Sequence, residues 1–306
     1  MYSMQTEKKH TCKDLKRRFV SVIVPVFNDQ SGIDAAINAL AEQTWPKDSY
    51  EIIIVDNASN PQIKLNPSFG DIARILICTT PGAYAARNSG IDNAKGDIFA
   101  FTDADCLPAP DWIHTGVSAL KGNKGHCIVG GEVTMTLSPK PTAVELYRYL
   151  TGFTQRENIE QRGFSVTANM FVTRSQVQSV GKFDEGLLSG GDLEWCWRAG
   201  HSGWPVVFAP EVIVTTVPRI SLLKAVRQVR RVAGGRRNLL KMKAVHVNPK
   251  RVRPRRTARE AARWILSHPD VSLWNRFRML GIASILKTVH FIERIRLTQG
   301  VSAERR

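Results

Sequence analysis

The stretch IFAFTDADC, residues 98–106, is the most informative part of this chain, because a short apolar run leads directly into two carboxylates, Asp103 and Asp105. The run Ile98–Phe101 predicts a strand that is buried on both faces. The two aspartates then leave the sheet at its carboxyl edge, where open α/β sheets bind ligands. Two carboxylates separated by one residue can face the same hard cation, and such a cation could hold a diphosphate. An isolated pair of this kind could also be an acidic turn exposed to solvent. The surrounding sequence is therefore needed to distinguish a cation-binding site from such a turn.

Strands and helices alternate on the N-terminal side of this pair. Three more β-branched or aliphatic runs predict buried strands at 19–26, 51–55 and 74–78. Helical spacing of apolar residues follows the first run, and the alanine-rich stretch 82–94 predicts a second helix. This alternation is typical of βαβ units. The predicted fold class is therefore α/β, with a mostly parallel sheet flanked by helices.

The pattern is looser after residue 105. It predicts strands at 127–137, 164–173, 206–208 and 212–216, and helices at 141–152, 176–180 and 192–199. From residue 220 onward it predicts helix, divided into two segments by Pro249 and Pro254.

Composition and charge set limits on the class of protein. Hydrophobic residues make up 43% and charged residues 23% of the 306, which argues against wholesale disorder. Five cysteines without CxxC spacing disfavour a disulfide framework or a zinc site and favour a reducing cytosol. We find no apolar core of a signal peptide near the N-terminus, and nowhere the run of about 18 apolar residues that a spanning helix needs.

The net charge of +16 is concentrated in the last third of the chain. Residues 219–306 contain 23 Lys and Arg but 4 Asp and Glu, whereas residues 1–218 have a balance of −3. The sequence thus predicts a polar, basic N-terminal segment (1–18), a nearly neutral catalytic domain (19–218) and a basic, helical C-terminal region (219–306).

Five ordered motifs resemble the family 2 glycosyltransferases of GT-A fold, of the non-processive bacterial type. They are VSVIVPVFN (20–28), EIIIVDNAS (51–59), GAYAARNSGIDNAKGD (82–97), FTDADC (101–106), and SVGKFDE with GGDLEW (179–185 and 190–195). The resemblance covers about two thirds of the chain. It implies a Rossmann-like, mixed but mostly parallel sheet, here with a basic C-terminal helical extension.

The resemblance also implies where a nucleotide-sugar donor binds. The end of the first strand, with Pro25, Phe27 and Asn28, and the end of the second, with Asp56, would meet the nucleotide base. Asp103 would lie close to the ribose and the sugar, and Asp105, helped by Asp103, would bind a Mn²⁺ or Mg²⁺ ion. A turn-capping role is the alternative for Asp56.

Two residues of the predicted helix 82–94, Arg87 and Asn88, face the same edge of the sheet. An arginine beside a diphosphate would supply charge-assisted hydrogen bonds. The equally weighted alternative is that Arg87 is an ordinary surface cation.

Asp192 is the predicted catalytic base. Transfer to a hydroxyl needs a group that accepts its proton, and the resemblance implies an aspartate here, with inversion at the anomeric carbon. The family usually carries Glu-Asp at this point, whereas this chain has Gly191-Asp192. Glu194 could orient Asp192 or the acceptor. Asp192 could also cap the following helix, and Trp195 and Trp197 are either an acceptor platform or core residues.

A second departure concerns the metal. Many members carry a histidine at the end of the strand equivalent to 212–216, where this chain has Thr216. The ion would then be held by Asp105, the diphosphate and water, or be bound weakly.

The cationic region 219–306 contains two sequence patterns that bear on membrane binding and processivity. The stretch Gln228–Val232 resembles the QxxRW motif of processive members, but Val232 stands at the tryptophan position. The stretch Arg276–Leu297 predicts a basic amphipathic helix, which is typical of an anionic membrane surface. A helix packed on the catalytic domain is the alternative, and binding to nucleic acid ranks third because no motif for it is present.

These observations favour an inverting, metal-dependent glycosyltransferase in cell-surface polysaccharide or glycolipid synthesis. It would move a sugar from a nucleotide-sugar, with a UDP-sugar favoured, to a hydroxyl of a glycan or lipid-linked acceptor. It would be cytoplasmic, on the inner face of the membrane. The alternatives are a nucleotidyltransferase on a similar fold, and a degenerate GT-A domain that serves as a membrane or nucleic-acid adaptor.

Overall fold

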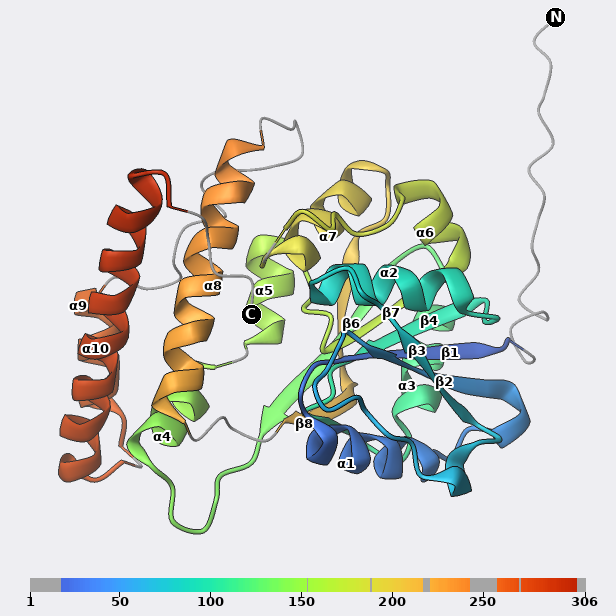
Figure 1. Cartoon of the computed structure of the whole chain (residues 1–306), viewed down its shortest axis with the longest axis horizontal. Helices are drawn as coiled ribbons and strands as arrows, with labels where there is room; N and C mark the ends of the chain where they lie inside the picture. Colours follow the sequence, from blue (N-terminus) through green and yellow to red (C-terminus); the bar gives the residue numbers. More distant parts are fainter. Residues whose placement is uncertain are drawn as a thin grey trace, which may run out of the picture.

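The computed structural model describes residues 18–152, 154–187, 189–216, 221–242, 258–269 and 271–301. The predicted N-terminal segment, except Arg18, and the dividing residues Pro249 and Pro254 lie outside these described residues. Figure 1 shows a curled sheet with helices on both faces and, beside it, a group of long helices from the C-terminal third.

One eight-stranded sheet forms the centre of the molecule, and its order across the sheet is β3-β2-β1-β4-β7-β6-β8-β5. The pairs among β3, β2, β1 and β4 are parallel, as is β6 with β8, whereas β7 and β5 run antiparallel to their neighbours. The predicted mixed, mostly parallel sheet is therefore confirmed. In chain order the strands are β1 (Val20–Val26), β2 (Tyr50–Asp56), β3 (Ala73–Ile77), β4 (Ile98–Thr102), β5 (Cys106–Pro108), β6 (Ile128–Met135), β7 (Asn169–Thr173) and β8 (Val206–Thr216).

The β-branched runs form the buried centre of this sheet because both of their faces are covered. Along β1, Val22 and Val24 join the core under α1 (Gln30–Ala41) and α3 (Trp112–Gly122). Ile23, between them, joins the core under α2 (Ala83–Asn93), α6 (Arg174–Val180) and α7 (Gly191–His201). Alternate residues of a strand point to opposite faces of the sheet. A strand that is covered by helices on both faces therefore needs a mostly continuous apolar run.

Three elements were not predicted from the sequence. The helix α5 (Gln155–Arg162) buries one aliphatic residue, Ile159, so it lacks the apolar repeat that indicates a helix. In α3 the buried apolar residues Trp112, Ile113, Val117 and Leu120 do stand at helical spacing, and this repeat was overlooked; Gly116 lies against Phe171, where a Cβ atom would come within 2.4 Å of the ring. The strand β5 has three residues.

Two predicted strands are one in the structure. The strand β8 pairs with β6 at 206–209 and again at 213–216, with a register shift between Gly131 and Glu132 of β6. The predicted break at 209–211 falls on this irregularity. The predicted strand 164–173 is reduced to β7, and two short 3₁₀ helices lie at Lys47–Ser49 and Pro67–Phe69.

The C-terminal region is helical, as predicted, with three helices among its described residues: α8 (Leu222–Lys241), α9 (Ala258–Ser267) and α10 (Leu273–Thr298). The helix α4 (Ala143–Thr151) joins this group, because its Val144 and Leu146 share small apolar cores with α8, α9 and α10. Within the described residues, no helix combines the length and apolarity needed to cross a bilayer.

Candidate active site

The loops that follow β1 and β2 are tied together at the carboxyl edge of the sheet. The backbone N–H of Asn28 donates to Ser59 Oγ over 2.8 Å, and Asn28 Oδ1 accepts from the N–H of Asn60 over 2.8 Å. Asn28 adopts a φ of 52°, a conformation that asparagine tolerates better than most residues. Phe27 is 38% exposed beside it, and Pro25 is half-buried in β1.

Asp56 orders the loop after β2. Its carboxylate is fully buried and accepts from the backbone N–H groups of Ser59 (2.9 Å) and Ile63 (3.1 Å). The turn-capping role is therefore present. Contact of Asp56 with a nucleotide base stays a prediction.

A second group of side chains meets at the same edge from three elements. Arg87 of α2 is buried, with 4% of its surface exposed, and its Nη2 lies 2.5 Å from Oδ1 of Asp103, which follows β4. Arg87 and Asp103 are also electrostatic neighbours of Asp192 in the first turn of α7. The interpretation of Arg87 as a surface cation is thus wrong. The structure brings together three predicted site residues that are 16 and 89 positions apart along the chain.

Asp192 does not cap its helix. The N-cap of α7 is Gly190, in the left-handed region at φ 83°, and Asp192 lies two residues further on. Its Oδ1 accepts from the backbone N–H of Leu193 over 2.9 Å. Withdrawal from bulk water raises the pKa of the Asp192 carboxyl, and the Leu193 N–H and the charge of Arg87 offset part of that rise. A carboxylate with a raised pKa is a stronger base than an exposed one.

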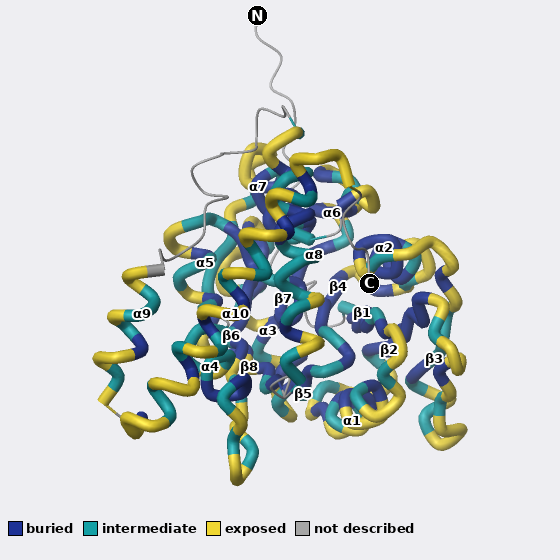
Figure 2. The backbone as a smooth tube through the Cα atoms, turned by 60° about the vertical axis from the view of Figure 1, so that its left-hand side comes forward, coloured by how far each residue is buried: buried dark blue, intermediate teal, exposed yellow. Residues whose placement is uncertain are grey.

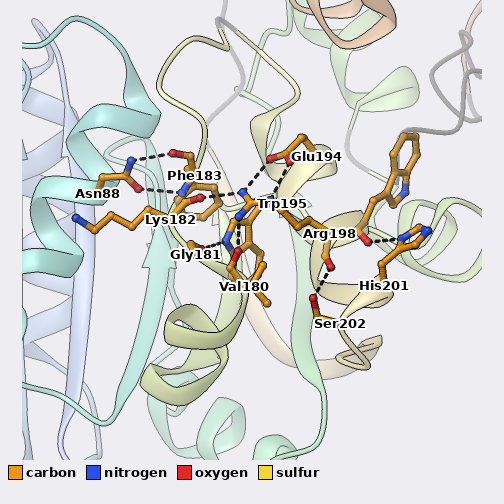
Figure 3. Close-up of polar contacts among 11 residues, drawn as sticks. Asn88, Val180, Gly181, Lys182, Phe183, Glu194, Trp195, Arg198, His201 and Ser202 are labelled. Atoms are coloured by element: carbon orange, nitrogen blue, oxygen red, sulfur yellow. Dashed lines mark hydrogen bonds and ion pairs between the residues drawn. The ribbon is translucent and has the colours of Figure 1, made fainter. Parts of the chain in front are cut away.

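Glu194 lies two residues along the same helix, on another side of it. It is buried and forms a two-pronged ion pair with Arg198, at 2.9 Å to Nε and 3.1 Å to Nη2 (Figure 3). Arg198 also donates to the carbonyl groups of Val180 and Lys182. This placement gives Glu194 a structural role, holding the segment 180–182 on α7. The other predicted role of Glu194, orienting the acceptor or Asp192, stays a prediction. The contacts of Glu194 do not support it.

Asn88 binds the neighbouring part of the same segment. Its side chain exchanges two hydrogen bonds with the main chain of Phe183, at 2.9 and 3.0 Å (Figure 3). It also donates to Glu185 Oε1. Asn88 is buried and connects α2 to the loop before α7. Its predicted contact with a diphosphate stays a prediction, and the contacts observed are structural.

The two tryptophans of α7 are core residues. Trp195 and Trp197 are buried, and each indole N–H donates over 2.7 Å to a main-chain carbonyl, of Gly181 and of Arg162. The alternative of an exposed acceptor platform is wrong.

The residues predicted for the metal lie at the end of β4 and beside β8. Asp103 and Asp105 are partly exposed, and Thr216 Oγ1 donates to the main-chain carbonyl of Asp105 over 3.2 Å. In the described part of the chain, no three His, Cys, Asp or Glu side chains are grouped to hold an ion. Two carboxylates at an open edge still match the oxygen preference of Mg²⁺ and Mn²⁺. They fit an ion whose other ligands come from a diphosphate and water.

Two protein families match this chain. Glycosyl transferase family 2 matches residues 21–174, about half of the 306, and Glycosyl transferase family group 2 matches residues 98–296. The chain belongs to glycosyl transferase family 2. The resemblance predicted from the five motifs is confirmed.

Relatives and a solved structure agree with this membership. Glycosyltransferase AglE of Haloferax volcanii is 39% identical over 200 residues, which are 64% of this chain and 66% of AglE. A dolichyl N-acetyl-alpha-D-glucosaminyl phosphate 3-beta-D-2,3-diacetamido-2,3-dideoxy-beta-D-glucuronosyltransferase of Methanococcus voltae is 26% identical over 69% of this chain and 70% of its own. The mannosyltransferase PcManGT of Pyrobaculum calidifontis was solved in complex with GDP-Man and Mn²⁺. It superposes on this chain with a TM-score of 0.56 at 20% sequence identity, and the superposition covers 94% of this chain and 81% of the PcManGT chain. At that identity the superposition supports the GT-A fold.

The departure from the family's Glu-Asp pair has a structural cause in this glycosyltransferase. A Cβ atom on Gly191 would lie 2.7 Å from the ring of Tyr84, so the tyrosine occupies the space that a side chain would need. The Tyr84 hydroxyl accepts from the N–H of Gly191 over 2.8 Å and lies 3.4 Å from Asp192 Oδ1, to which it donates. Burial raises the pKa of this phenol, so it stays protonated. We did not predict Tyr84 from the sequence, although GAYAARN contains it.

Proposed function

We propose that this protein is an inverting glycosyltransferase that moves a sugar from a nucleotide-sugar to an acceptor hydroxyl, with Asp192 as the base. The observation that carries the proposal is the meeting of Asp103, Arg87 and Asp192 at the carboxyl edge of the sheet in a family 2 chain. The nucleotidyltransferase and adaptor alternatives are disfavoured by the family match.

The proposed chemistry assigns separate tasks to the two sides of the site. The loops of Phe27, Asn28 and Asp56 would bind the nucleotide, and Arg87 holds Asp103 toward the sugar and ribose. An ion bound by Asp105 and Asp103 would neutralise the charge of the departing diphosphate. Asp192 accepts the hydroxyl proton while the acceptor oxygen bonds to the anomeric carbon, and the bond from that carbon to the diphosphate breaks on the opposite face.

Sugar transfer should depend on a divalent ion, because negative charge develops on the departing diphosphate and Arg87 is already paired with Asp103. We expect EDTA to abolish transfer and added Mn²⁺ or Mg²⁺ to restore it. A thermal-shift screen of UDP-, GDP- and dTDP-sugars, with and without Mn²⁺, should identify the donor. UDP stays the favoured base, and the GDP-Man complex of PcManGT is the reason to include GDP-sugars. Release of pyrophosphate from a nucleoside triphosphate instead would indicate a nucleotidyltransferase.

Activity should be lost on the acid side of neutrality. Because the pKa of Asp192 is raised, the carboxylate that accepts the proton is present above that pKa and disappears as the pH falls through it. The acid limb of the kcat/KM profile should therefore lie above the usual range of an aspartate. Tyr84→Phe removes the hydroxyl that donates to Asp192, so it should move this limb to higher pH. The same profile for both proteins would show that Tyr84 acts through packing alone.

The C-terminal region is the proposed membrane contact, at the inner face of the cell membrane, where a lipid-linked or cell-surface acceptor would be presented. The outward side of α10 exposes Trp274 (71%), Phe277 (63%) and Phe291 (63%), together with Ile285, Ile292 and Ile295. Between Arg278 and Arg294 the exposed residues of this helix carry no charge. An apolar stripe between cationic ends suits an anionic lipid surface. Figure 2 shows how far the exposed positions extend over the C-terminal helices.

The double substitution Trp274→Ser and Phe277→Ser should weaken sedimentation with anionic liposomes by about 10-fold or more, since each aromatic contributes about 1.5–3 kcal/mol when buried. Ile77→Ser is the control, because Ile77 is also an exposed apolar residue (49%) and lies on β3, at the far edge of the sheet. Unchanged sedimentation of the α10 variant would argue for the alternative in which this region packs on protein. The division of the chain at 218 and 219 also stays a proposal.

A further inference from the structure

The turn at 189–191, which leads into Asp192, contains two glycines and has little that fixes it from within. Gly190 is the N-cap of α7, lies in the left-handed region at φ 83° and makes no side-chain capping bond. Gly191 follows it, and glycine has more backbone freedom than any other residue. The position of the Asp192 carboxylate therefore depends on the helices that pack against this turn.

Two helices from distant parts of the chain contact the turn. From α2, Tyr84 fills the space beside Gly191 and accepts from its N–H over 2.8 Å. From α8, in the C-terminal region, Gly235 approaches so closely that a Cβ atom on it would lie 2.3 Å from the main-chain oxygen of Ser189 and 2.7 Å from the Ser189 Cβ. Non-bonded carbon atoms settle at about 3.5 Å or more, so α8 can lie this close only because residue 235 has no side chain.

The contact between α8 and the turn extends over a full turn of that helix. Gly235 is buried in the interior of α8, where glycine weakens a helix relative to alanine, so its presence needs a reason outside the helix. Leu239 follows four residues later, on the same side of α8. A Cβ atom on Gly190 would lie 2.6 Å from Leu239 Cδ1, and Leu239 is buried in the apolar core that also contains Leu193 of α7. Two neighbouring residues of the turn are thus in contact with α8.

The rest of α8 connects this contact to the C-terminal helices. Its Ala225 and Val229 pack with Leu286 of α10 in a small apolar core. Figure 1 shows α8 between α10 and the part of the molecule that contains α7 and the sheet. Leu239 also lines, together with Asp192, a cavity of about 160 Å³. The helix α8 therefore forms one wall of the space that Asp192 faces.

We propose, on the basis of the function above, that α8 positions the catalytic base: Gly235 and Leu239 fix the turn at 189–191 and, through it, the carboxylate of Asp192. Both are positioning residues, which act through Asp192. The C-terminal region then has a part in catalysis in addition to the proposed membrane contact. A turn held less firmly lets the carboxylate move away from the hydroxyl whose proton it accepts, and a displacement of about 1 Å can lower a rate by about 10²-fold.

The test is the substitution Gly235→Ala in the full chain. The added methyl group meets main-chain atoms of Ser189, which cannot rotate away as a side chain can, so α8 and the turn have to separate by about 1 Å. The activity measured is hydrolysis of UDP-glucose, GDP-mannose and dTDP-glucose with Mn²⁺. In this reaction water takes the place of the acceptor: its proton goes to Asp192, its oxygen bonds to the anomeric carbon, and the bond to the diphosphate breaks.

We expect hydrolysis by Gly235→Ala to slow by about 10²-fold, while the Kd for UDP or GDP, measured by calorimetry, stays that of the wild type. Leu239→Ala should slow it by about 10-fold, since the turn loses one of its two contacts with α8. A wild-type rate in Gly235→Ala would overturn the inference. So would a loss of nucleotide binding that matches the loss of rate, because the substitution would then act on the whole site.

Amide hydrogen exchange in peptides that span 189–195 tests the geometry without any donor. Local opening sets the exchange rate of such a segment, so exchange should rise by about 10-fold in Gly235→Ala and in Leu239→Ala. Equal exchange in the wild type and both variants would overturn the inference, whatever the rates of hydrolysis.

Two control variants separate the contact from the substitution as such. Gly200→Ala adds the same methyl group to an exposed glycine of α7 that has no other group within 4 Å, so it should change neither exchange nor hydrolysis. Leu239→Met keeps most of the buried volume and should keep most of the activity that Leu239→Ala loses. Equal losses in Leu239→Ala and Leu239→Met would overturn the packing role of Leu239.

A double-mutant cycle separates the positioning of Asp192 from a general loss of structure. In the Asp192→Asn protein the group that Gly235→Ala displaces is already missing, so the second substitution should change the residual hydrolysis little. Fully additive losses would show that Gly235 does not act through Asp192, and would overturn the inference.

Failure of this inference is distinguishable from failure of the proposed function. If Asp192→Asn hydrolysed the donor as fast as the wild type, the assignment of the base would fail, and this inference with it. If Asp192→Asn were slow while Gly235→Ala kept the wild-type rate, the proposed function would stand and only the role of α8 would fail.

Discussion

Replacing Asp192 by asparagine should lower the rate of sugar transfer by about 10²- to 10⁴-fold, the range that removal of a general base produces. Asparagine has nearly the same shape and can still accept from the N–H of Leu193, but it cannot take the acceptor's proton. Nucleotide binding should stay nearly unchanged, because Asp192 lines a small cavity whose walls include neither Asn28 nor Asp56. Steady-state kinetics and calorimetric titration with the nucleotide measure the two effects.

The same substitution should raise the melting temperature. The pKa of Asp192 is higher in the folded protein than in the unfolded chain, so the ionised carboxylate destabilises the folded state at neutral pH, and this cost disappears as the pH falls. Asparagine removes it. Asp71→Asn, at an exposed position, is the control and should change neither property. An Asp192→Asn protein that kept more than about a third of its activity would contradict the assignment of the base.

Replacing Arg87 by methionine should damage both activity and stability. Methionine fills much of the same buried volume but leaves Asp103 without its ion-pair partner and Asp192 without a nearby cation. Removing one partner of a buried pair costs about 3–5 kcal/mol, and the partial exposure of Asp103, 35% for its side chain, favours the lower end. We expect urea unfolding to show this loss, and transfer to fall by about 10²-fold or more because Asp103 loses its orientation.

Arg87→Lys separates charge from geometry. Lysine keeps a positive charge but cannot present the planar donors of a guanidinium, so it should recover most of the stability and less of the activity. If Arg87→Met unfolded at the same urea concentration as the wild type, the ion pair with Asp103 would have no role in the fold.

The sheet was predictable from the sequence because it is buried on both faces. The strands β1, β2 and β4 have apolar residues at most positions on both faces, and such runs are visible without knowing any neighbour. The helix α5 was not predictable in this way, because it buries a single aliphatic residue, so tertiary packing outweighs local periodicity there. The helix α3 does have apolar residues at helical spacing, and the sequence permitted a prediction that we did not make.

The candidate site was predictable in part. Asp103 and Asp192 follow from motifs, since each stands directly beside a recognisable strand or helix. Tyr84 was missed because its position matters only together with Gly191, which is 107 residues away in the chain. The roles of Asn88 and Glu194 also depend on partners, Phe183 and Arg198, that only the folded chain identifies.

Residue types and their spacing were sufficient to predict the parallel core, the two carboxylates after β4, the aspartate at the start of α7 and the cationic C-terminal third. These features are local, because each depends on residue type and spacing within a single element. The folded chain was needed to show that Arg87 is buried, paired with Asp103 and near Asp192, that Tyr84 fills the space beside Gly191, and that Arg162 and Arg236 line one cavity. Those contacts join segments that are far apart in the chain, and burial and charge at such meeting points depend on how α2, α5, α7 and α8 pack together.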